Sequence, residues 1–79
     1  MEQQTRYEIY AQRNSDFVNT FTGDRQERVL AYLSKFCLEN EQTFNINSER
    51  KSAFNEGARA VILEIRRWLD MDMSKIEKD

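Results

Sequence analysis

Apolar residues recur at intervals of three and four over a long stretch in the C-terminal half of the chain. They are Phe54, Gly57 or Ala58, Val61, Ile62, Ile65, Trp68 and Leu69. This spacing places them in one stripe along an α-helix. Asn47 or Ser48 can cap the first turn through a side-chain oxygen, and Glu49 puts negative charge at the positive end of the helix dipole. The pattern predicts a helix over residues 48–69, the longest in the chain.

A second helix is predicted over residues 5–21, where apolar side chains again share one face. That face carries Tyr7, Tyr10, Ala11, Phe17, Val18 and Phe21. Asn14 lies on the same stripe, and Ser15 and Asp16 are poor helix formers. We therefore expect a kink or a local break near Asn14.

A turn at Gly23 separates this helix from a third, predicted over residues 25–38. Gly23 can adopt a left-handed conformation, and Asp24 followed by Glu27 resembles a capping box. The stripe expected in the core consists of Val29, Leu30, Leu33, Phe36 and Cys37. A second stripe, expected to face solvent or a partner, consists of Arg25, Arg28, Tyr32 and Lys35.

Residues 39–47 and 70–79 show no sustained helical period. Phe44 and Ile46 alternate around Asn45, which favours a short extended piece with both side chains against the core. Residues 70–79 are expected to add one or two turns, or to form a tail that orders on binding. The chain is thus predicted to be a single small all-α domain, most simply an antiparallel bundle of three helices.

The length of the chain, 79 residues, limits how much surface it can bury. A domain of this size buries only about 60–65% of the surface that its unfolded chain exposes. Such a domain is marginally stable unless it associates, so we expect a homo-oligomer.

Charge and composition exclude several classes of function. The chain has 12 Lys and Arg residues against 14 Asp and Glu residues, a net charge of −2, so any nucleic-acid binding is expected to be weak. It has no apolar run of membrane-spanning length and no signal-peptide pattern, which predicts a soluble protein that is not exported. Its single cysteine, Cys37, is expected in the core, and histidine is absent. We therefore expect no catalytic residues, metal, cofactor or small-molecule substrate.

Gly57 is the most informative residue of the long predicted helix, because glycine inside a helix costs about 1 kcal/mol relative to alanine. Ala58 and other small residues lie near it, so another helix can approach closely, either within the chain or across a homo-oligomer. Trp68 ends the apolar stripe and is expected in the core or at an interface.

Cationic residues form a second set of candidate interaction residues. They are Arg25, Arg28, Arg59 and Arg66, together with the aromatic Tyr32. These side chains can meet phosphates. The alternative is a solvated face with weak ion pairs such as Glu56 with Arg59 and Glu64 with Arg67.

Two segments carry a resemblance to a known family. They are Arg28-Val29-Leu30-Ala31-Tyr32-Leu33 with Phe36-Cys37, and Phe54-Asn55-Glu56-Gly57-Ala58-Arg59-Ala60-Val61 with Ile65 and Leu69, separated by a polar loop with Phe44. They resemble a family of small tailed-bacteriophage proteins typified by one from a Bordetella podovirus. Glu56, Gly57 and Arg59 match its Glu-Gly-x-Arg segment, and the resemblance covers residues 17–69.

The resemblance implies genes in phage clusters for head assembly and DNA packaging, with no assigned enzymatic activity. Our leading hypothesis is a non-enzymatic helical protein that associates with itself or with a larger viral or host protein. The alternatives are an inhibitor of a host enzyme or defence complex and a nucleic-acid-binding packaging accessory. We expect it in the host cytoplasm during infection or in the virion.

Overall fold

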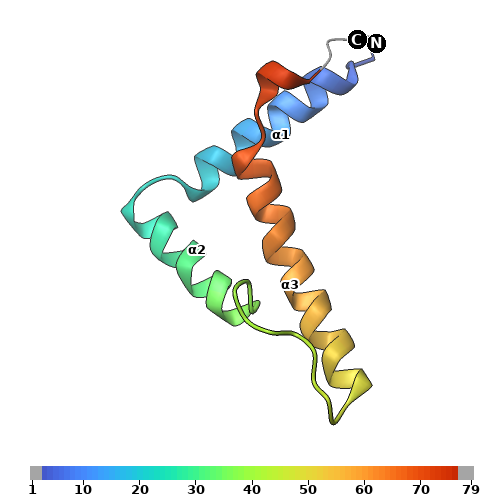
Figure 1. Cartoon of the computed structure of the whole chain (residues 1–79). Coiled ribbons are helices and arrows are strands. Elements are labelled where there is room, and N and C mark those ends of the chain that lie inside the picture. The colour runs from blue at the N-terminus through green and yellow to red at the C-terminus, as the bar shows by residue number, and fades with distance from the viewer. Residues whose placement is uncertain (1–2, 77–79) are drawn as a thin grey trace.

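The computed structural model describes residues 3–76, and within this range it is all-helical (Figure 1). Its elements are α1 (Arg6–Phe21), α2 (Asp24–Phe36), α3 (Glu49–Asp70) and a short 3₁₀ turn, η1 (Met73–Lys75). The predicted class, three helices with the longest at the C-terminal end, is confirmed. Residues 77–79 of the predicted tail lie outside the described residues.

Polar side chains at the caps explain where the helices start. The Thr5 hydroxyl accepts a hydrogen bond from the Glu8 amide, and the Ser48 hydroxyl accepts one from the Lys51 amide, both at 3.1 Å. Gly23 has φ of +114° and is the N-cap of α2, so Asp24 is already helical and the predicted capping box does not form. Glycine occupies this reversal of the chain because residues with a side chain seldom adopt a positive φ.

The predicted break near Asn14 is wrong, since α1 continues through it without interruption. Asparagine weakens a helix when its side chain competes for nearby backbone groups. Here Asn14 Nδ2 donates instead to the carbonyl oxygen of Trp68, at 2.7 Å. A tertiary contact therefore occupies the group that would have disturbed the helix.

The three helices form an open arrangement. Figure 1 shows α1 lying across the C-terminal end of α3, while α2 runs back beside α3 in the opposite direction. The molecule measures 52 × 30 × 24 Å, with a radius of gyration of 16.0 Å. A compact chain of this length has a radius of about 12 Å. The helices therefore leave much of their surface uncovered.

The core lies between α2 and α3 and is small. Leu30, Cys37 and Ile62 are buried there. Around them pack four partly buried side chains, Phe21, Leu33, Ile65 and Leu69. Cys37 is buried, as expected.

Four residues expected in the core stripes are instead exposed, which corrects the sequence-based assignment. They are Val29, Phe36, Phe54 and Val61, with exposed fractions of 49%, 69%, 76% and 57%. On both α2 and α3 the apolar residues cover a wider part of the helix surface than the contact between the two helices. The apolar side chains on one side of each helix are therefore left uncovered.

The loop before α3 also differs from expectation, because Phe44 and Ile46 are exposed rather than tucked against the core. Polar contacts attach its backbone to α3. The Asn45 amide donates to the Ser52 hydroxyl at 2.6 Å, and Asn55 Nδ2 donates to the Thr43 carbonyl at 3.3 Å. Because these bonds hold the backbone against a polar part of α3, the apolar side chains point outward. None of the described helices is long and apolar enough to cross a membrane.

Candidate interaction surface

Glu39 joins the C-terminal end of α2 to the middle of α3. Arg66 donates to both carboxylate oxygens of Glu39, at 2.9 and 3.2 Å, and the Ser34 hydroxyl donates to one of them at 2.6 Å. Arg59 Nε donates to the Glu39 backbone carbonyl at 3.0 Å. Leu38 turns the chain here with φ of +60°. Two of the candidate cationic residues, Arg59 and Arg66, thus hold the fold together.

The hydrogen bond from Arg66, reinforced by the bond from Ser34, lowers the pKa of Glu39 below its ordinary value. Two parallel bonds from an arginine are a strong form of ion pair because their geometry is fixed and charge-assisted. The Glu39 side chain is 14% exposed and the Arg66 side chain 38%. Partial burial protects the pair from full screening by solvent.

Glu39→Gln is expected to lower the free energy of unfolding at pH 7 by about 1–2 kcal/mol. This is less than the roughly 1.5–3 kcal/mol of a hydrogen bond to a charged group, because Arg66 is 38% exposed and solvent screens the pair. The pKa of Glu39 is lower in the folded state than in the unfolded state, so the carboxylate stabilises the protein above the unfolded value, about 4.3. That stabilisation disappears as pH falls through the folded pKa. The difference between wild type and variant should therefore shrink with acid.

Urea denaturation followed by circular dichroism, at one protein concentration and a series of pH values, measures this difference. Glu41→Gln is the matched control, since Glu41 is exposed and its carboxylate has no ion-pair or hydrogen-bond partner within residues 3–76. A Glu39→Gln variant with the stability and pH profile of the control would contradict the role of the pair.

Trp68 attaches α1 to the end of α3 and is 3% exposed. Its ring meets Tyr10 edge-on, with centroids 5.3 Å apart, and lies 6.4 Å from the ring of Phe17. The guanidinium of Arg13 lies 4.7 Å from the ring centroid. The indole nitrogen donates to Glu64 at 2.6 Å. Trp68 is thus part of the fold of the single chain, whereas the sequence left open an interface role.

Gly57 is exposed, and a Cβ atom at this position would meet no atom within 4 Å. The expectation of close packing against another part of the same chain is therefore wrong. The predicted contact within the chain is absent because α1 and α2 both pack nearer the C-terminal half of α3. The remaining explanation from the sequence, a contact with another molecule, stays a prediction.

An apolar surface, called here the α2–α3 face, covers one side of this helix pair. It consists of Val29, Tyr32 and Phe36 from α2 with Phe54 and Val61 from α3. The rings of Tyr32 and Phe36 stack at 6.2 Å, although they are 66% and 69% exposed.

Helix geometry explains why these residues share one side. Val29, Phe36 and Val61 directly precede residues buried between the helices. One step along an α-helix is a rotation of about 100°. Because α2 and α3 run in opposite directions, the same rotation on each leads to the same side of the pair (Figure 1).

Arg25 and Arg28 are exposed on α2 beside this face, as is Lys35. Their side chains make no ion pair or hydrogen bond with the described part of the chain. Of the ion pairs predicted for the solvated face, Glu64 with Arg67 forms, at 3.3 Å. Arg59 donates to the Glu39 backbone carbonyl and makes no ion pair with Glu56. Of the candidate cations Arg25, Arg28, Arg59 and Arg66, the two still free to bind a partner, Arg25 and Arg28, therefore lie on α2.

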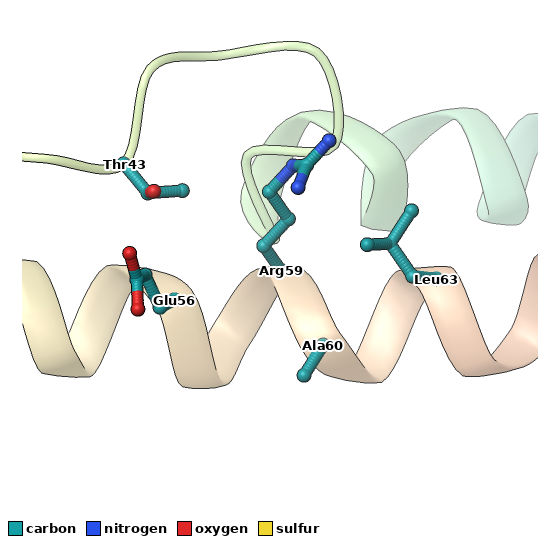
Figure 2. A pocket seen from close by; sticks show the side chains of 5 residues that line it. All are labelled: Thr43, Glu56, Arg59, Ala60 and Leu63. Atoms are coloured by element: carbon teal, nitrogen blue, oxygen red, sulfur yellow. The ribbon is translucent and has the colours of Figure 1, made fainter.

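The loop and α3 enclose a shallow hollow, shown in Figure 2. Its lining consists of Thr43, Glu56, Arg59, Ala60 and Leu63, around a volume of about 220 Å³. Arg59 rises from α3 toward the chain segment that it binds, so one of its donors is already used. Sites for small molecules are usually larger, about 300–1,000 Å³. Within residues 3–76, no three acidic or cysteine side chains come together as metal ligands.

The predicted site residues therefore divide into two groups. Tyr32, Gly57, Arg25 and Arg28 are exposed, whereas Ala58, Arg59, Arg66 and Trp68 are half-buried or buried within the fold. Sequence reasoning missed Glu39, because a loop carboxylate with partners 20 and 27 residues away leaves no local pattern. It also missed Phe36 and Phe54 as surface residues.

Comparison with known proteins gives one result at the level of the family. The family model of the Bbp19-like phage proteins matches residues 17–78, which include α2, α3 and the end of α1. Neither a curated protein nor a solved structure matches the chain. The family match covers most of the chain and includes the α2–α3 face. The chain belongs to the Bbp19-like family of bacteriophage proteins.

Proposed function

We propose that this phage protein is a non-enzymatic interaction protein that acts in virion head assembly or DNA packaging through protein–protein contacts. The observation that carries the proposal is the α2–α3 face. Tyr32, Phe36 and Phe54 are each at least 66% exposed. At about 150–250 Å² for an aromatic side chain, these three rings alone expose roughly 300–500 Å².

An apolar surface of this size favours a protein partner. The largest contiguous apolar patch on a typical monomer is about 300–600 Å² and is often functional. Aromatic residues are also enriched in protein–protein interfaces. The resemblance to proteins from head and packaging gene clusters supports the assignment to assembly, in the host cytoplasm or the virion.

A second candidate function, nucleic-acid binding during packaging, is favoured by the exposed cations of α2. Arg25, Arg28 and Lys35 lie on one side of a single helix without partners among the described residues. Phosphate contacts by three cations give weak, strongly salt-dependent binding. The apolar face is the larger feature, so protein contact is the better-supported role. An inhibitor of a host enzyme or defence complex would use the same face.

Quantitative mass spectrometry of procapsids and virions from phage carrying wild-type or variant protein tests the proposal. We expect the wild-type protein in procapsids or virions, and we expect Phe36→Ser to remove it from them while its level in the lysate is unchanged. Arg28→Ser is the control on the same helix. Arg28→Ser should leave the incorporation of the protein into procapsids and virions unchanged if protein–protein contacts determine that incorporation.

Loss of incorporation with Arg28→Ser but not with Phe36→Ser would favour the nucleic-acid function. A role in assembly would be contradicted if the wild-type protein were missing from both procapsids and virions and heads formed normally in phage that lack the protein. That result would favour the host inhibitor.

A further inference from the structure

We propose that the α3 side of the α2–α3 face, with Phe54 and Val61, joins two copies of this chain in a twofold dimer, in which α3 packs antiparallel against α3 of the second copy and crosses it at Gly57. This inference rests on the proposed function and deepens it, because it names a second copy as the partner of the same face. Three features of the chain support the dimer: the unfilled core, the charge pattern of α3 and the space at Gly57.

A single copy leaves its core incomplete. Its four buried apolar residues are Leu30, Cys37, Ile62 and Trp68, whereas nine large apolar side chains in the described range are exposed. The radius of gyration, 16.0 Å, exceeds the value for a compact chain by about a third. A standard interface buries about 800 Å² on each partner. The three exposed rings of the α2–α3 face together amount to roughly half of that area.

The pattern along α3 is complementary to itself about Gly57. Antiparallel pairing places residue 57−n opposite residue 57+n, as a closed twofold interface requires. The pairs are Arg50 with the partner's Glu64, Ala53 with the partner's Val61 and Phe54 with the partner's Ala60. Each large side chain thus meets a smaller one. The contact from residue 50 to residue 64 extends over about 21 Å of helix.

The charges select this orientation over a parallel one. Parallel packing would set Arg50 against Arg50 and Glu64 against Glu64, and like charges brought together oppose association. In the antiparallel pair each arginine faces a carboxylate. The Arg50 side chain has no partner among the described residues. Glu64 accepts the hydrogen bonds from Trp68 and Arg67 through the same oxygen, Oε1. The other carboxylate oxygen is free to accept from the second copy.

Gly57 gives the second helix room to approach. A Cβ atom there would meet nothing in the single chain, so the glycine serves no contact within it. Its cost in helix propensity is about 1 kcal/mol. At the crossing point, the missing side chain lets two helix backbones come together. Ala53 and Ala60 have small side chains on the same side of α3 and leave further room for the second helix. The dimer therefore gives a reason for the residue that the single chain does not.

Sedimentation equilibrium across the micromolar range tests the proposal, with wild type, Gly57→Leu and Glu56→Leu compared. We expect wild type at twice the mass of the chain. Gly57→Leu should raise the dissociation constant at least about tenfold, because leucine overpacks the crossing. Its helical circular dichroism should persist, since the position is open in the single chain. Glu56→Leu adds the same side chain one position away, about 100° around the helix, and should still dimerise.

Charge reversal tests the antiparallel register. Arg50→Glu and Glu64→Arg should each weaken the dimer several-fold, and the double variant should recover most of the affinity, because the opposed charges are exchanged. Glu64→Arg also loses the bond to Trp68, so the comparison that decides is the double variant against Glu64→Arg alone.

A wild-type chain that sediments as one copy throughout the range would overturn the proposal, as would a dimer unaffected by Gly57→Leu. A double variant that dimerises no more tightly than Glu64→Arg alone would also exclude this register. If the chain were monomeric and yet incorporated into procapsids or virions through Phe36, the dimer would be excluded while the proposed function would stand.

Discussion

Trp68→Ala is expected to lower the free energy of unfolding by about 3–5 kcal/mol, the usual cost of removing a buried tryptophan. The ring is 3% exposed and packs against Tyr10 and Phe17 of α1. Its loss removes the aromatic surface on which α1 lies. At about 0.05–0.15 kcal/mol per residue, a chain of this length has roughly 4–12 kcal/mol of stability in total. The variant should therefore be largely unfolded, or have α1 detached.

Far-UV circular dichroism and hydrogen exchange measure this effect, with Trp68→Phe as the control. Phenylalanine keeps an aromatic ring but loses the indole donor to Glu64, so we expect a smaller loss. In Trp68→Ala, the amides of α1 should exchange as freely as an unfolded segment. Protection of α1 at the wild-type level would show that other contacts hold it.

Ile62→Ala is expected to cost about 2–5 kcal/mol, because it leaves a cavity at a fully buried position. Ile62 is 0% exposed and forms the core together with Leu30 and Cys37. The partly buried Ile65 and Leu69 of α3 pack against this core. Val61, the neighbour of Ile62, is 57% exposed. Val61→Ala should change the stability of the single chain by no more than about 0.5 kcal/mol.

Chemical denaturation of both variants, made in the Gly57→Leu background to remove the dimer, gives these two values for the single chain. The adjacent pair is a direct test of how α3 is rotated in the fold. Equal losses from Ile62→Ala and Val61→Ala would mean that the buried side of α3 has been assigned wrongly.

The helices were predictable because their signals are local. Ser48 caps α3 as its position before the apolar stripe indicates, and Gly23 has the positive φ that its place between two periodic segments suggests. The burial of Cys37 and Trp68 also followed from their positions on apolar stripes. In each case the determining residues lie within a few positions of one another.

The surface was not predictable in the same way, because periodicity shows which residues share a side of a helix but not how far along it a neighbour extends. Phe54, Val61 and Trp68 lie on one line of α3, yet α1 covers only Trp68. Glu39 is held by Arg66, 27 residues away, which no local pattern reveals. Long-range geometry decides both outcomes.

The contact between Asn14 and Trp68 also limits how early α1 can dock on α3 during synthesis. The two residues are 54 positions apart, and the bond joins the middle of the first helix to the end of the last. Contacts between distant parts of a chain form only after a large loop has closed, which slows folding. While the ribosome is still making α3, α1 can contact α2 but not the C-terminal end of α3. The first helix therefore reaches its final position only after synthesis has passed residue 68.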